Sequence, residues 1–544
     1  MVKNFLALLS LRQNSILSGA AVLMVTVAAS KVLGLVRDRL LAHTFTPDQT
    51  AVFFAAFRLP DLMFQLLIFG AVSVAFIPVF TDILQKSEGE AFGFAADILN
   101  VVLIGFTAVS IAVFFLVQPL TNLIVPGFTM DQKVATAGLT QIILFGQILL
   151  VIGSFFTGVS QSFQRFIIPA LASVFYNAGI ILGILFLAPV WGLSGPAYGV
   201  VLGAAMHGLA QIPLVTSLGF RYKFSFNIFS SGIREVWGMM SIRTVGVAVE
   251  QINETVGIIL ASLISSASVT FLTFAQHLHT VPIGLFGATL AQAALPVLAR
   301  AKAKGETEAF KGTLLTTMHQ ILFLALPAVA ILIVLRIPAV RLVFGASQFN
   351  WEATVLTGRT LAFLSIGLAA QSVVLLLARS FYALKDTKTP VLISISTVLL
   401  NIILSVFFVR ILHLEVWSLG LSYSIATITS VPLFIGALNG KLGGFNLKNL
   451  CLPAIKMVVA AGISAVALYI PIKLLDQLVF DTTKTVNLLL LTGIASFFGL
   501  SVYLFLVWMM KVRELETFGN FIKKIYRAKF KVESKEIIQE AGKV

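Results

Sequence analysis

Long apolar runs, interrupted by glycine, proline or clusters of charge, recur along the whole chain. A membrane-spanning helix needs roughly 20 mainly apolar residues, and about fourteen runs meet this requirement. In the first half, spans are predicted near residues 16–42, 51–80, 93–118, 137–162, 167–188 and 192–217. In the second half they are predicted near residues 236–265, 270–299, 315–340, 355–381, 390–411, 415–438, 451–475 and 487–511. The pattern predicts an all-α polytopic membrane protein.

Composition supports a membrane protein and excludes a soluble fold. Of the 544 residues, 58% are apolar and 11% are charged, which is less than half the charged fraction of an ordinary soluble domain. The apolar run that starts at Ile16 exceeds the length of a signal sequence, so it is interpreted as the first span. The single cysteine, Cys451, forbids an intrachain disulfide.

The net charge is +15. The positions of the basic residues in the loops of a membrane protein explain this excess, so nucleic acid is not expected as a partner. Lys and Arg concentrate in alternate loops, and by the positive-inside rule this predicts cytoplasmic N- and C-termini. The tail, residues 512–544, alternates apolar and basic residues and is predicted to be an amphipathic helix on the anionic inner leaflet. A solvated regulatory tail is the alternative.

Short matches between the two halves predict an internal repeat. Phe57, Phe69 and Gly70 correspond to Phe274, Phe286 and Gly287 at a constant offset of about 217 residues, in a construction common among transporters. Two six-helix lobes related by a parallel repeat are therefore expected, with a cleft between them. The predicted divisions are an N-lobe (residues 1–217), a C-lobe (218–438), two added helices (439–511) and the tail (512–544).

Ionisable residues at membrane depth are expensive and therefore point to function. They gather in the first two spans of each half: Lys31, Arg37, Asp38, Arg58, Asp61, Arg243, Glu250, Glu254, His277 and His279. These spans are expected to face each other across the cleft. A net basic cavity suits an anionic headgroup such as a pyrophosphate, because guanidinium groups bind phosphate oxygens in pairs.

Structural explanations stand beside this functional one. Asp38 and Arg39 could reach the membrane interface, and Arg58 with Asp61 could form a pair three residues apart on one helix. Glu250 and Glu254 need neutralisation by Lys31, Arg37 or Arg243, by a proton, or by Na⁺. His207 and His319 are expected to form ordinary interhelical hydrogen bonds.

Two further observations concern motion and chemistry. Pro282, Gly284 and Gly287 lie in one predicted span and favour a hinge, with a static kink as the alternative.

The sequence holds no metal-ligand cluster, nucleophile elbow or phosphate-binding glycine loop, so an enzyme is not expected.

Several motifs resemble the lipid II flippase family, MurJ or MviN. They are Ser30-Lys31-Val32-Leu33-Gly34-Leu35-Val36-Arg37-Asp38, Phe53-Phe54-Ala55-Ala56-Phe57-Arg58-Leu59-Pro60-Asp61, Arg165-Phe166-x-Ile168-Pro169 and Asp386-x-Lys388-Thr389-Pro390. The resemblance covers about residues 16–510. It implies fourteen helices of the multidrug/oligosaccharidyl-lipid/polysaccharide exporter fold, with the two helices of residues 439–511 forming a groove for a lipid tail.

The implied activity is outward movement of an undecaprenyl-pyrophosphate-linked peptidoglycan precursor across the bacterial plasma membrane by alternating access. The substrate-binding candidates are Lys31, Arg37, Arg58, Arg243 and His277, and Asp38, Glu250 and Glu254 are candidates for coupling or charge pairing. No cofactor is implied. Coupling to Na⁺, H⁺ or the membrane potential is open, as are partners among cell-wall synthesis proteins.

The sequence also departs from the family. The family's charged positions in the second span fall on Phe64, Gln65 and Phe69, and its Asp-Arg pair in the eighth span falls on Gln276 and His277. Three alternatives follow: a flippase for another polyprenyl-linked glycan, a cation-coupled exporter of the same fold, and a transport-dead membrane scaffold.

Overall fold

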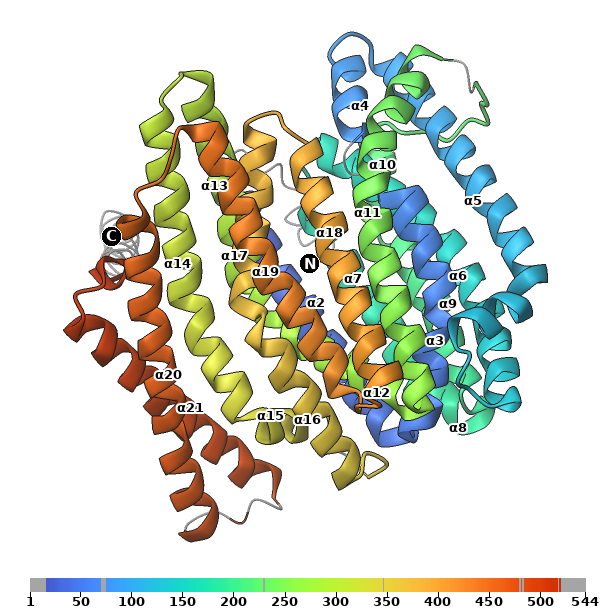
Figure 1. Ribbon diagram of the computed structural model, residues 1–544. Coiled ribbons are helices and arrows are strands. Elements are labelled where there is room, and N and C mark those ends of the chain that lie inside the picture. Colours follow the sequence, from blue (N-terminus) through green and yellow to red (C-terminus); the bar gives the residue numbers. More distant parts are fainter. Residues whose placement is uncertain are drawn as a thin grey trace, which may run out of the picture. The chain divides into compact units, whose positions relative to one another are not determined.

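The computed structural model describes residues 16–69, 75–227, 230–345, 347–478, 481, 484–516 and 518–519. These residues form helices joined by short connections, and no strand occurs among them (Figure 1). The predicted all-α fold is confirmed. Most of the tail predicted as an amphipathic helix, residues 520–544, lies outside the described residues.

The first half of the chain contains the helices of the first six predicted spans. They are α2 (Ile16–Thr44), α3 (Pro47–Phe64), η1 (Gln65–Phe69), α4 (Ile77–Leu84), α5 (Glu88–Ile124), α6 (Met130–Ser162), α7 (Ile167–Leu182), η3 (Gly183–Leu187), α8 (Ala188–Trp191), α9 (Ser194–Leu209) and α10 (Ile212–Ser217). The η segments are π-helical turns that continue the neighbouring α-helices.

The second half contains the remaining helices. They are α11 (Ser231–Ile264), α12 (Ser266–Pro282), η4 (Ile283–Ala288), α13 (Thr289–Ala303), α14 (Thr307–Val334), α15 (Arg336–Phe344), α16 (Trp351–Ile366), α17 (Leu368–Ala383), α18 (Lys388–Val406), η5 (Phe407–Ile411), α19 (Trp417–Leu442), α20 (Leu447–Leu478) and α21 (Thr485–Met509).

Among the described residues, 12 helices are long and apolar enough to cross a membrane. The count rises to 13 if α16 and α17, which meet at a bend of 44°, form one span. Helix α2 lies at the first predicted span and is not among these candidates. Each of the fourteen predicted spans overlaps one helix or a series of consecutive helical segments.

Local sequence signals explain where several helices begin. Thr46 caps α3 and Thr129 caps α6, each with a glutamine three residues later that bonds back to the cap (Gln49 and Gln132). Such capping boxes satisfy backbone N–H groups that the first helical turn leaves unpaired. Pro47 occupies the first position of α3, where a missing N–H costs nothing.

The backbone supports the predicted repeat. π-Helical segments interrupt the second span of each half (η1 and η4) and the fifth span of each half (η3 and η5). Positive φ angles also recur at the same separation along the chain, at Gln164 (59°) with Lys385 (60°) and at Gly192 (54°) with His413 (51°). Irregularities that recur in order are expected of two copies of one supersecondary unit.

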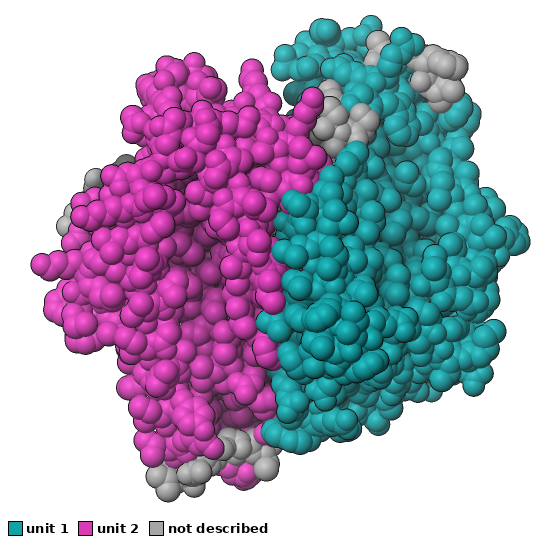
Figure 2. All heavy atoms as spheres, in the orientation of Figure 1, with its two compact units in different colours: residues 1–278, 343–360, 394–422 teal, residues 279–342, 361–393, 423–544 magenta. Residues whose placement is uncertain are grey.

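The chain divides into two compact units, which Figure 2 colours separately. One contains residues up to 278, 343–360 and 394–422, and the other contains residues 279–342, 361–393 and 423 onward. The lobe boundaries at residues 217 and 438 stay a prediction.

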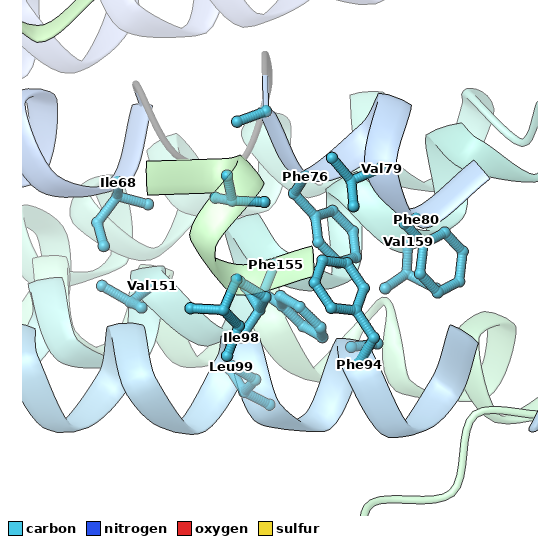
Figure 3. Packing of buried hydrophobic residues seen from close by; sticks show 14 of the residues in the cluster. Ile68, Phe76, Val79, Phe80, Phe94, Ile98, Leu99, Val151, Phe155 and Val159 are labelled. Atoms are coloured by element: carbon cyan, nitrogen blue, oxygen red, sulfur yellow. The ribbon is translucent and has the colours of Figure 1, made fainter. Parts of the chain in front are cut away.

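An aromatic cluster forms part of the core of the first unit. The ring of Phe76 lies 5.1 Å from Phe80, 6.0 Å from Phe94 and 5.1 Å from Phe155, centroid to centroid (Figure 3). The three nearest helices, α4, α5 and α6, are thereby packed together. Tight helix packing of another kind joins α7 to α9, where a Cβ on Gly179 would lie 2.2 Å from the Gly203 Cα.

Candidate functional site

Asp38 is the centre of a buried charge cluster. Its side chain is 1% exposed, and its Oδ1 accepts hydrogen bonds from Nη2 of Arg37 at 2.7 Å and from Nε at 2.9 Å. Its Oδ2 lies 2.6 Å from Nδ1 of His277. Both Asp38 oxygens are therefore bonded inside the protein, which excludes the interfacial position considered for this side chain.

Helix α7 adds polar groups to the cluster. The amide of Asn177 accepts from Nη1 of Arg37 at 3.3 Å and donates to the Ser30 hydroxyl at 3.3 Å. Arg37 and Ser30 are seven residues apart and share one face of α2. The guanidinium is thus oriented by a carboxylate on its own helix and by an amide on a neighbouring helix.

Arg58 joins α3 to α11. Nη1 donates to Glu254 at 2.8 Å, Nη2 to the carbonyl oxygen and side chain of Gln251 at 2.6 and 2.7 Å, and Nε to Thr255 at 2.9 Å. The Arg58 side chain is 5% exposed, whereas that of Glu254 is 49% exposed. All three guanidinium nitrogens therefore donate across to one face of α11.

This arrangement corrects two expectations. Arg58 does not pair with Asp61 on its own helix, because its nitrogens are directed at α11. Among the described side chains the partner of Glu254 is Arg58, and not Lys31 or Arg37. Spacing within one helix could not reveal a partner that lies 196 residues away.

Asp61 links the two clusters electrostatically. It accepts a hydrogen bond from Gln147 of α6 at 3.2 Å and interacts through its charge with both Arg58 and Arg37. The charged groups of α2, α3 and α11 therefore belong to one network within the first compact unit.

The other predicted site residues have different surroundings. Lys31 is exposed and forms no ion pair with the described residues. Glu250 is also exposed, one turn before Glu254 on α11. Arg243 lies on α11, but its side chain is outside the described residues.

Further contacts join the first half of α12 to α3. Thr270 donates to the carbonyl oxygen of Pro47 at 2.7 Å, and Ser266 bonds to Asp48. The ring of Phe274 lies 5.5 Å from Phe54 and stacks on Phe344 at 4.1 Å. The start of α12 is therefore held against α3 by both polar and aromatic contacts.

The other histidines behave differently from His277. His319 bonds through Nε2 to the carbonyl oxygen of Leu450 at 3.0 Å, which confirms an interhelical hydrogen bond. For His207 the expectation is wrong, because its buried Nδ1 has no hydrogen-bond partner among the described residues and its ring packs against Gly153. His279 is 3% exposed, and both of its ring nitrogens lack such a partner within the described part of the chain.

The predicted hinge residues lie at the start of a π-helical segment or within it. Pro282 ends α12, and Gly284 and Gly287 lie within the π-helical segment η4. A Cβ on Gly287 would lie 2.8 Å from the Ser372 Cα, so this glycine permits close packing on α17. A π-helical turn leaves backbone groups less regularly paired and often marks a functional position. The hinge itself stays a prediction.

Sequence reasoning gave no site role to four residues that complete the network: Asn177, Gln147, Gln251 and Thr255. All four are polar residues within apolar helices. Gln251 and Thr255 lie close to Glu254 along α11. This closeness in sequence to a predicted site residue is the signal by which they could have been found. No group of His, Cys, Asp or Glu suited to a metal ion occurs among the described residues.

These features define a polytopic helical transporter with a duplicated architecture, and solved structures share its fold. A structure titled "Lipid II flippase MurJ, inward closed conformation" matches with a TM-score of 0.76 and 23% identity, over 90% of this chain and 98% of that chain. An inward-facing multidrug resistance MATE family transporter of the MOP superfamily matches with a TM-score of 0.64 and 14% identity, over 76% and 94%.

The model of the family "Lipid II flippase MurJ" matches residues 41–510, and the chain belongs to this family. A probable lipid II flippase MurJ of Bdellovibrio bacteriovorus is 25% identical over 90% of this chain and 95% of the relative. The lipid II flippase MurJ of Burkholderia cenocepacia is 27% identical over 75% and 81%. The predicted family and transporter class are confirmed, and the family is not one of catalytic enzymes.

Proposed function

We propose that this protein moves lipid II, the lipid-linked peptidoglycan precursor, from the inner to the outer leaflet of the bacterial plasma membrane. The observation that carries the proposal is the family match over residues 41–510. The basic groups of α2 and α3, which are Lys31, Arg37 and Arg58, support it, because an exporter of organic cations would instead be lined by carboxylates and aromatic rings.

Lys31 and Arg37 are the first candidates to bind the pyrophosphate. Lys31 is exposed and forms no ion pair with the described residues, so its charge is available to an anion. Arg37 is 19% exposed, and its fork-shaped guanidinium now binds Asp38. A pyrophosphate offers the same bidentate geometry and a greater negative charge. Substrate can thus replace Asp38 as the partner of Arg37.

Arg58, Arg243 and His277 are proposed as further substrate ligands in a different conformation. In the present structure the nitrogens of Arg58 are bonded to α11, and Nδ1 of His277 is bonded to Asp38. Arg58 and His277 become available to a headgroup only when α11 and α12 separate from α3 and α2.

Alternating access gives these contacts a role. With cytoplasmic termini, the connection between α2 and α3 faces outward, so the contacts of Pro47, Phe54, Asp38 and Arg58 with α11 and α12 form an outer gate in its closed state.

The π-helical segments η1 and η4 are proposed as the bending points of the second and eighth spans. Helices α20 and α21 are proposed to hold the lipid tail, and the basic tail to lie on the anionic inner leaflet.

Complementation of a bacterium depleted of its own lipid II flippase tests the function. The wild-type chain is expected to restore growth and Arg37→Ala to fail, whereas Arg359→Ala, which removes an exposed pair with Glu415, is expected to grow normally. Membrane expression is quantified for each variant. A folded wild-type chain that fails to restore growth contradicts the proposed function; an active Arg37→Ala contradicts only the substrate role of Arg37.

A further inference from the structure

The side chain of His277 on α12 contacts the buried carboxylate of Asp38 on α2. Its Nδ1 lies 2.6 Å from Oδ2 of Asp38, and its ring packs edge-on against Phe54 at 5.9 Å. The histidine side chain is 34% exposed and Asp38 is 1% exposed. The imidazole is therefore partly accessible from outside the protein, whereas the carboxylate bonded to it is buried.

The surrounding groups determine what protonation does. Arg37 bonds to the other oxygen of Asp38 from α2, and Asn177 of α7 bonds to Arg37. The carboxylate of Asp61 on α3 also acts on Arg37 through its charge. Arg37 and His277 therefore bond to different oxygens of Asp38, and the imidazole is the more exposed of these two partners.

Protonation changes the strength of the contact between α2 and α12. A neutral imidazole can donate a hydrogen bond to the carboxylate of Asp38, whereas an imidazolium adds the attraction between two opposite charges. Histidine changes its charge in the physiological pH range. A contact that is stronger when protonated must bind its proton more tightly in the closed state than in the open state.

We propose that the His277–Asp38 pair is a proton-operated latch that closes the outer gate. One proton from solvent binds the imidazole, Asp38 remains a carboxylate, and α12 is held against α2. Loss of that proton to solvent leaves the neutral ring and permits α2 and α12 to separate. The latch rests on the proposed function, because it sets the step of alternating access at which the outer side opens.

Gate opening can be measured without substrate, which separates this inference from the proposed function. In a Cys451→Ser background, spin labels at Met130→Cys and Asn350→Cys report the distance between the outward ends of α6 and α16 in nanodiscs. Distance distributions are recorded from pH 5.5 to pH 8.5 for wild-type His277, for His277→Gln and for His277→Arg. His413→Asn is the matched control, because His413 is exposed and has a φ of 51°, which asparagine tolerates.

The wild-type chain and His413→Asn are expected to open as the pH rises, with the open-to-closed ratio changing up to tenfold per pH unit, the limit for one linked proton. His277→Arg is expected to stay closed across the range and His277→Gln to stay more open, each without pH dependence. A pH response that survives in both His277 variants, or its absence in the wild type, overturns the latch. Failed complementation with an intact pH response would contradict the proposed function alone.

Discussion

Arg58 ties α3 to α11 through a guanidinium whose three nitrogens all donate to that helix. A nonpolar replacement leaves the Gln251 carbonyl oxygen and the Glu254 carboxylate without this donor. Charge-assisted hydrogen bonds are stronger than those between neutral groups. Arg58 is therefore expected to stabilise the closed conformation, in addition to its proposed binding of a substrate headgroup in another conformation.

Arg58→Met is therefore expected to lower the free energy of unfolding by about 2 kcal/mol or more, the scale of lost hydrogen bonds to a charged group. Thermal unfolding of the purified protein in detergent measures the change. Arg359→Met is the control, since its partner Glu415 and Arg359 itself are about half exposed and such pairs contribute about 1 kcal/mol or less. Equal effects of the two substitutions would count against the buried network.

Asp386 caps the start of α18. Its carboxylate accepts from the N–H groups of Lys388 and Thr389, from the Thr389 hydroxyl, and from Lys441 at 3.0 Å. Against the opposing effect of burial, the bonds from Thr389 and Lys441 lower the pKa of Asp386 to about 2. The ionised form is therefore favoured in the folded protein.

Asp386→Ala is expected to cost about 0.5–2 kcal/mol at neutral pH, the range for a lost helix cap. Since folding lowers the pKa, the stabilisation is complete above the unfolded value of about 4 and disappears as the pH falls through the folded value. Unfolding midpoints of wild type and variant should converge between about pH 4 and pH 2. A difference that stays constant over this interval would refute the assignment.

At the level of elements, glycines set the distance between α7 and α9. Gly179 and Gly183 face Gly199 and Gly203, and a Cβ on Gly203 would lie 2.4 Å from the carbonyl oxygen of Tyr176. Glycines four residues apart let helix backbones approach closely in membranes. Because Asn177 lies on α7, this packing also positions the amide that orients Arg37.

Gly203→Val is expected to destabilise the protein by about 1–3 kcal/mol or more, the cost of overpacking a close contact. It should also reduce complementation, because α7 moves away from α2. Gly138→Val on α6, where no other described atom would lie within 4 Å of an added Cβ, provides the control for valine in a helix. Thermal unfolding and growth are the measurements, and equal behaviour of the two variants would be contrary to this account.

The π-helical segments provide a second test at this level. A π-helical turn arises from one extra residue in an α-helix, so deletion of Phe286 from η4 should restore a continuous α-helix with little change in register. We expect normal membrane expression and loss of growth in the complementation assay. Deletion of the exposed loop residue Gly443 is the control; growth with the Phe286 deletion would argue against a bending role for η4.

For the molecule as a whole, apolar run length predicted the helices well, because membrane thickness fixes how long a spanning helix must be. The set of charged residues was also visible, since ionisable groups at membrane depth are few. Their pairing was not: Arg58 contacts Glu254 and Asp38 contacts His277 across long separations in sequence. Helical spacing indicates which residues share a face, but it does not indicate which neighbour that face meets.

Transport of lipid II by the purified full-length chain is the most direct test of the central claim. In proteoliposomes carrying fluorescently labelled lipid II in the inner leaflet, the wild-type protein should deliver the lipid to the outer leaflet, where an impermeant quencher detects it. Arg37→Ala should lose this activity, and His413→Asn should retain it. Wild-type vesicles that match protein-free vesicles, despite correctly folded and oriented protein, would contradict the account.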